Sequence, residues 1–145
     1  MKTHKLLVLM IFSFLLLSTS AAAISLDGSG PLLCSINDVI ECSPDRECIS
    51  GSASSVDLPN FFKVDVSNAV LSVPQGEEDA RTSTIKSVAH LDGKLILQGV
   101  EQGVAGEDDA VGWTLSIDEE DGRMIFSSSR EKAGFIIFGA CTALK

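Results

Sequence analysis

The fold is decided by one stretch, Val111-Gly112-Trp113-Thr114-Leu115-Ser116-Ile117, in which large apolar residues take every second position. Successive side chains of a β-strand point to opposite faces, so this period of two puts the large residues on one face and the small polar residues on the other. The pattern predicts a strand with one buried face. That face consists of Val111, Trp113, Leu115 and Ile117, whereas Thr114 and Ser116 face outward.

Segments of the same kind lie upstream and are joined by turn residues. Residues 62–66 alternate apolar and charged side chains, and Ser67-Asn68 then turns the chain back. Asp92-Gly93 separates 84–91 from 94–100, and Asp-Gly is a preferred pair for a two-residue hairpin turn in which both residues need a positive φ. Both regions are therefore predicted to be antiparallel hairpins.

Downstream of the central strand, turn residues separate two more strands, 123–127 and 135–141. An early strand near 35–42 brings the number of strands to about eight. The wider segment 32–42 also fits one face of a helix, so both structures remain open for it.

The order of these segments predicts an all-β, single-domain fold. Consecutive hairpins pair neighbours in sequence, which produces an antiparallel meander whose first and last strands are open edges unless the sheet closes. We expect about eight strands in a small closed β-barrel, with a two-sheet β-sandwich as the alternative.

The first 23 residues have the three-part pattern of an export signal. Lys2 and Lys5 precede an apolar run, 6–17, which ends at a stretch of small residues, 18–23. At about 1.5 Å per residue the run spans about 18 Å, too short for a hydrocarbon core of about 30 Å. We predict cleavage after Ala23, which leaves residues 24–145 as the single domain of a periplasmic or secreted protein with no membrane anchor.

All four cysteines lie in the part predicted to be exported. An even number of cysteines in an oxidising compartment predicts a disulfide framework. Cys42 and Cys48 enclose a short polar turn with a proline, which favours their pairing and leaves Cys34 for Cys141. A zinc site competes, but the spacing lacks the two-residue knuckle typical of zinc-binding cysteines.

The composition is acidic. The chain has 11 Lys and Arg against 20 Asp and Glu, a net charge of −9, and removal of Lys2 and Lys5 with the signal lowers the charge to −11. Nucleic acids and anionic membrane surfaces attract basic patches, so this balance argues against both as partners. The sequence contains no glycine-rich phosphate loop, dinucleotide fingerprint or haem-attachment motif, so we expect no cofactor.

Aromatic and branched residues of the predicted strands are the candidate ligand-binding residues. The interior of a barrel of about eight strands is either filled by side chains or leaves space for one small ligand. A solid core competes with a ligand cavity, since any core needs inward aromatic residues. The candidates are Phe62, Val64, Trp113, Leu115 and Phe126, and Phe61, Phe135 and Phe138 are further strand aromatics that the cavity interpretation includes.

Three acidic clusters lie at predicted turns, where charge keeps a protein soluble: 77–79, 107–109 and 118–121. The second, Glu107-Asp108-Asp109, is the best candidate for a cation site because nearby glycines permit a wrapped loop, but none of the clusters has the ligand order of a calcium loop. His90 lies beside Asp92 at a turn, so we expect an exposed side chain there and assign no catalytic residue.

Three segments, Leu58–Asp65, Lys94–Gly99 and Phe138–Thr142, carry a resemblance to other sequences. Through them and its cysteine positions, the chain resembles, from about Cys34 to the C-terminus, a family of small exported bacterial proteins of unassigned function. The resemblance implies a bacterial periplasmic or secreted protein. It implies no substrate and no catalytic residue.

Two functions are compatible with these features. The scarcity of catalytic side chains favours a non-enzymatic binding module that holds a small apolar ligand or presents loops to an extracytoplasmic protein, as small inhibitors do. The alternative, which the acidic clusters motivate, is a carboxylate-based hydrolase that acts outside the cytoplasm. We expect binding rather than catalysis.

Overall fold

The computed structural model describes residues 25–74, 82–103, 110–130 and 132–144. These residues form β-strands and one short 3-10 helix, η1. The elements are β1 (Leu32–Ser43), β2 (Arg46–Gly51), η1 (Ala53–Val56), β3 (Phe61–Asp65), β4 (Val70–Ser72), β5 (Thr82–Leu91), β6 (Lys94–Glu101), β7 (Val111–Asp118), β8 (Arg123–Arg130) and β9 (Ala133–Ala143).

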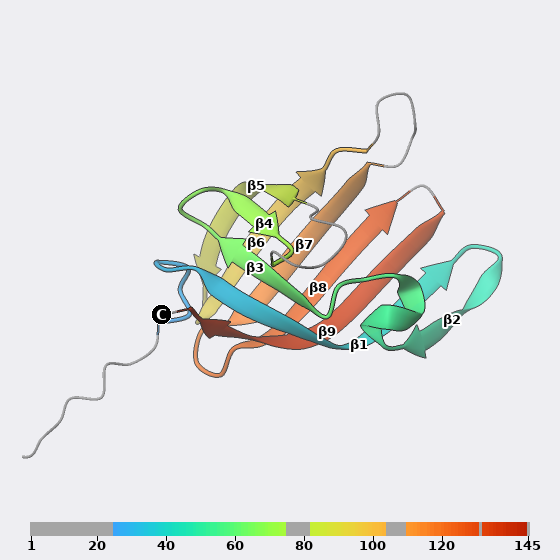
Figure 1. Cartoon of the computed structure of the whole chain (residues 1–145), viewed down its shortest axis with the longest axis horizontal. Coiled ribbons are helices and arrows are strands. Elements are labelled where there is room, and N and C mark those ends of the chain that lie inside the picture. The colour runs from blue at the N-terminus through green and yellow to red at the C-terminus, as the bar shows by residue number, and fades with distance from the viewer. Residues whose placement is uncertain (1–24, 75–81, 104–109, 131, 145) are drawn as a thin grey trace, which may run out of the picture.

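Eight strands form a closed antiparallel barrel (Figure 1). Strands β3 to β9 pair in sequence order, and β1 closes the barrel because it pairs with β3 on one side and with β9 on the other. The ambiguous segment 32–42 is thus a strand and not a helix. The predicted small closed barrel is confirmed, and the sandwich alternative is wrong.

Strand β2 is the extra strand, and it was not predicted from the sequence. It pairs with residues 39–43 of β1, past the four residues, 32–35, that pair with β3. Figure 1 shows it beside the far half of β1, next to η1. Because five of its six residues are exposed, no alternation of buried and exposed side chains marks it in the sequence.

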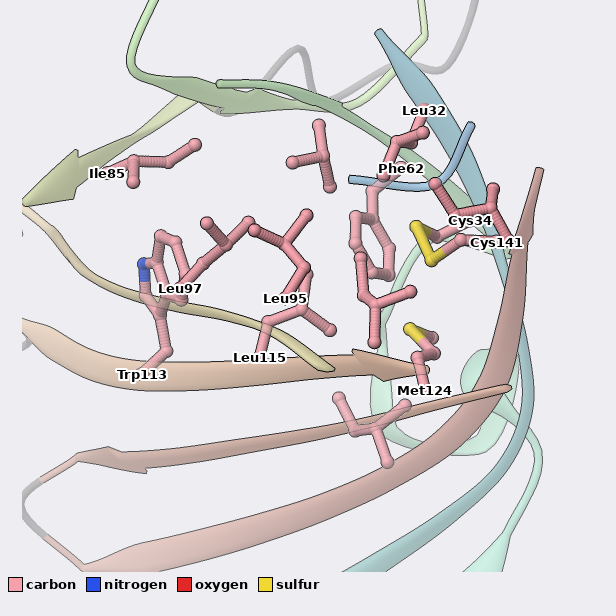
Figure 2. Close-up of a cluster of buried hydrophobic side chains, with 14 of the residues drawn as sticks. Leu32, Cys34, Phe62, Ile85, Leu95, Leu97, Trp113, Leu115, Met124 and Cys141 are labelled. Atoms are coloured by element: carbon pink, nitrogen blue, oxygen red, sulfur yellow. A yellow bond between two sulfur atoms is a disulfide. The ribbon is translucent and has the colours of Figure 1, made fainter. Parts of the chain in front are cut away.

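Both disulfides expected from the cysteine spacing are present. Cys34 and Cys141 face each other across the β1–β9 pair with their Cα atoms 4.0 Å apart, and Cys42 is bonded to Cys48 across the β1–β2 hairpin. The first bond lies inside the barrel at the seam (Figure 2). Two disulfides are consistent with a protein outside the cytoplasm.

The barrel interior is built in rows across neighbouring strands. Leu97, Leu115 and Phe126 lie opposite one another in the registers of β6, β7 and β8. The predicted phase of β7 is correct, because Trp113, Leu115 and Ile117 are buried while Val111 is half-buried at one end of the strand. Figure 2 shows side chains from several strands converging on this interior.

Glycines make room for the largest interior side chains. Gly99 lies opposite Trp113, and a Cβ atom there would collide with the indole and with the backbone carbonyl of Thr84. A Cβ atom at Gly139 would likewise collide with Met124. Small residues opposite large ones allow the interior of a narrow barrel to fill without strain.

Two of the strand aromatics proposed for the interior face outward instead. Phe61 and Phe138 are exposed, whereas Phe62 and Phe135 are buried. Phe61 and Phe62 are adjacent in one strand, so only one of them can point inward. Phe138 is three residues from Phe135 and therefore lies on the opposite face of β9.

Residues 25–31 cross one end of the barrel and close it. Leu26 is buried against the interior, and Gly28 packs on Val66 and Leu95 with a φ of +78°, a conformation that favours glycine. The β3–β4, β5–β6 and β7–β8 turns lie at this closed end.

Candidate functional site

A cavity of about 140 Å³ lies at the end of the barrel opposite to the end that residues 25–31 close. The first residues of β3, β5, β7 and β9 and the last residues of β4, β6 and β8 surround it, because these antiparallel strands alternate in direction. Most of its lining is apolar. We call this cavity the cup.

Three aromatic rings form the floor of the cup. The Trp113 and Phe126 rings are stacked with centroids 5.6 Å apart and an interplanar angle of 20°. The Phe62 ring is tilted by 59° against Phe126 at a centroid distance of 5.9 Å. Both stacked and tilted contacts are favourable geometries for aromatic pairs, so the three rings form one continuous apolar surface.

The indole of Trp113 is held by one buried hydrogen bond. Its Nε1 donates to the Oγ of Ser83 on β5 at 2.6 Å, and Ser83 is the only buried polar residue among those that the structure describes. The indole reaches β5 because Gly99, on the intervening strand β6, leaves space beneath it. Since the Ser83 oxygen accepts this bond, its own hydroxyl proton is a donor for a group in the cup.

Two opposite charges lie among the residues that line the mouth. Glu101 ends β6, and Arg130 ends β8, with its guanidinium 5.0 Å from the centre of the Phe135 ring, a cation–π contact. Glu101 is the only carboxylate among the described lining residues. The described part of the lining thus holds one carboxylate, whereas most glycoside hydrolases use two that face each other.

The structure separates the five candidate ligand-binding residues into two groups. Phe62, Trp113 and Phe126 line the cup. Val64 and Leu115 are fully buried and lie outside the lining, in the solid part of the core. The role of all five in ligand binding stays a prediction.

The polar residues of the cup were not among the residues predicted from the sequence. Ser83 could have been found, since Ser83 and Ile85 alternate with polar neighbours and share one face of β5. Glu101 and Arg130 gave no such signal. Charged residues are mostly exposed, so a charged residue at the end of a strand does not by itself indicate a binding site.

His90 lies at the closed end, away from the cup. Its side chain is half-exposed, and its Nδ1 is 2.7 Å from Oε1 of Glu119 in the neighbouring turn. Asp27, from the segment that closes this end, has its pKa lowered to about 2 by hydrogen bonds from Ser29 and Ser25 and by His90. The histidine therefore belongs to a surface network of turns.

The acidic cluster 118–121 stabilises the turn in which it lies. Asp118 accepts hydrogen bonds from Lys94 Nζ at 2.8 Å and from the backbone N–H of Glu120 at 3.0 Å. These hydrogen bonds lower the pKa of Asp118 to about 2, and the bond from Lys94 is the largest cause. Its carboxylate is thus already engaged within the protein.

The other two clusters, 77–79 and the candidate cation site Glu107, Asp108 and Asp109, lie outside the described residues. Within the part of the chain that is described, no group of three or more His, Cys, Asp or Glu side chains is arranged to hold a metal ion. In that same part, none of the helices has the length and apolar character needed to span a bilayer.

No family model, curated protein or solved structure matches this chain.

Proposed function

We propose that the protein is a non-enzymatic binding module that holds one small apolar molecule in the cup. The observation that carries this proposal is the cavity of about 140 Å³ above a floor of Phe62, Trp113 and Phe126. Ligand sites are typically concave and mostly apolar, with a few polar groups that fix orientation. Ser83 and Arg130 are such groups here.

The volume of the cup limits the ligand to about the size of one ring. Apolar cavities of roughly 150 Å³ bind benzene. A body of that size buries roughly 200 Å² of apolar surface, about 5 kcal/mol at 25 cal/mol per Å², which corresponds to a Kd of about 0.2 mM. A polar group at the mouth that reaches Ser83 or Arg130 adds to this affinity.

The module works outside the cytoplasm, in the periplasm or as a secreted protein. The signal pattern in residues 1–23 and the two disulfides support this location. Edman sequencing of the exported protein tests it, with Ile24 expected as the first residue.

Titration with benzyl alcohol and toluene tests binding in the cup. Trp113 is the only tryptophan and the chain has no tyrosine, so its fluorescence reports on the floor directly. We expect a saturable fluorescence change and a rise in Tm, because a ligand that binds only the folded state stabilises it. The absence of a saturable response to both probes contradicts the proposal.

A variant in which a side chain fills the cup tests the site most directly. Ser128→Phe places a ring in the lining from β8, and Thr84→Phe adds the same ring at an exposed position of β5 as the matched control. Binding is expected to be lost in the first variant and kept in the second. His90→Ala should bind like the wild type, and loss of binding in that variant alone would move the site to the closed end.

A further inference from the structure

The outer surface of β6 to β9 carries no charged side chain over most of its length. The thirteen outward positions are every second residue of 96–100, 112–116, 125–129 and 134–140, and all are uncharged. Roughly 30% of the residues on a typical protein surface are charged, so about four charged residues are expected among thirteen positions. We call this surface the neutral wall, and Figure 1 shows its four strands side by side.

Three large apolar side chains are exposed together on the neutral wall. Ile125 is 51% exposed and lies directly opposite Phe138, which is 38% exposed, in the β8–β9 pair. Ile136, 42% exposed, is two residues from Phe138 on the same face of β9. Contiguous exposed apolar side chains with polar surroundings mark interaction surfaces.

The polar part of the neutral wall consists mainly of hydroxyl groups. Thr114 lies opposite Ser127 in the β7–β8 pair, and Ser116 and Ser129 share the same face. A hydroxyl both donates and accepts hydrogen bonds, so a patch of hydroxyls is complementary to a copy of itself. A two-fold symmetric interface requires this property, since the same surface contributes from both subunits.

We propose that the neutral wall is the interface of a homodimer. The chain carries a net charge of −9, and of −11 without Lys2 and Lys5, so two copies repel each other through their acidic surfaces. The neutral wall itself brings no like charges together when two such copies meet, and exposed Asp38 of β1, opposite Phe138, lies at its border. A basic partner would instead gain by binding the acidic remainder of the surface.

The size of the neutral wall indicates a weak dimer. With strands about 4.8 Å apart and about 3.3 Å per residue, four strands and seven residues cover roughly 400 Å² per copy. A standard interface buries about 800 Å² per partner. We therefore expect a reversible dimer, populated in the range of tens to hundreds of micromolar.

Sedimentation velocity of the mature protein from 1 µM to 1 mM tests the dimer. A rise from monomer to dimer across this range is expected, and it should shift to lower concentration in 0.5 M NaCl because salt screens the repulsion between acidic copies. A monomer at every concentration and both salt levels overturns the proposal.

Matched charge insertions locate the interface. Ile136→Glu puts a charge into the neutral wall, and Val88→Glu puts the same charge at a 44% exposed position of β5 outside it. We expect the dimer Kd to rise at least tenfold in the first variant and to change less than threefold in the second. Equal effects, or a dimer unaffected by Ile136→Glu, overturn the assignment.

The milder variant Ile125→Gln provides a second test that adds no charge. Its side chain is as exposed as that of Ile136, so the barrel tolerates the change, and native Trp113 fluorescence verifies folding. We expect weaker association without loss of ligand binding in the cup. Dimerisation as strong as in the wild type contradicts the interface.

Discussion

Trp113 belongs to both the core and the cup. One side of its indole covers Gly99, its ring stacks on Phe126, and its N–H is satisfied by Ser83. A single side chain thus joins β5, β6, β7 and β8. Its removal should affect stability and any ligand response together.

Replacement of Trp113 tests this role. Trp113→Ala leaves a large hole and should lower the free energy of unfolding by about 3 to 5 kcal/mol. Thr114→Ala, on the outer face of the same strand, should change it by less than about 0.5 kcal/mol. Urea denaturation followed by circular dichroism measures both, and equal losses would mean that the strand phase is wrong.

The packing of the barrel interior requires glycine at position 99 as much as it requires tryptophan at position 113. In Gly99→Ala the new Cβ meets the indole and the Thr84 carbonyl, so about 1 to 3 kcal/mol should be lost through overpacking. Gly112→Ala is the control on β7, where a Cβ meets nothing within 4 Å. The same denaturation experiment applies, and a neutral Gly99→Ala would show that the indole has space to move.

At the scale of elements, the sequence predicted most strands because their two faces differ. The strand of residues 111–117 and the Asp92-Gly93 hairpin follow from alternation and turn chemistry, and both turn residues have the expected positive φ, +49° and +73°. Strand β2 has almost no buried face, and residues 25–31 close the barrel without regular structure. Neither segment therefore has a sequence pattern from which its structure could be predicted.

The turn after β7, which contains Asp118, predicts how the stability of the protein depends on pH. Asp118 has a usual pKa of 3.8 but titrates at about 2 in the folded protein, so its ionised form stabilises the fold above about pH 4. This stabilisation is lost as the pH falls from about 4 to about 2. Asp27, with a pKa of about 2, contributes in the same direction and the same pH range.

Asp118→Asn should flatten the loss of stability between pH 4 and pH 2, as measured by thermal unfolding. Lys94→Gln should flatten it in a similar way, since the hydrogen bond from Lys94 is the largest cause of the lowered pKa. The double variant should show little further change, because both residues act through one interaction. An unchanged acid profile in Lys94→Gln contradicts this account.

At the scale of the whole molecule, the sequence indicated closure through two independent features. The meander left two open edges, and the remaining cysteines, Cys34 and Cys141, lay near the two ends of the chain. The depth of the cup was not predictable, because alternation gives the face of a residue but not its height in the barrel. Val64 and Leu115 therefore looked equivalent to Phe62 and Trp113.

The two disulfides should differ in their effect on stability. In the loop-entropy model, removal of Cys34–Cys141, which spans 107 residues, costs about 4 to 5 kcal/mol, whereas removal of Cys42–Cys48, which spans 6, costs about 2 kcal/mol. Paired Cys→Ala variants and denaturant unfolding measure the difference, and non-reducing peptide mapping verifies the pairing. A larger loss of stability on removal of Cys42–Cys48 would contradict the conclusion that Cys34–Cys141, at the seam, is the main constraint on the unfolded chain.

The seam between β1 and β9 also sets the order in which the chain can fold. Strands β3 to β9 pair with sequence neighbours, and β1 pairs with β2 and β3 on one edge, but its other edge needs β9, about a hundred residues later. Local pairs form quickly and distant ones slowly, so this edge of β1 stays unpaired until the last strand has formed. In pulsed hydrogen exchange, amides of β6 to β8 should gain protection before the β1 amides that bond to β9. Until then the edge of β1 that pairs with β9 is open to the strands of other chains, so a slow closing step exposes the protein to misassembly.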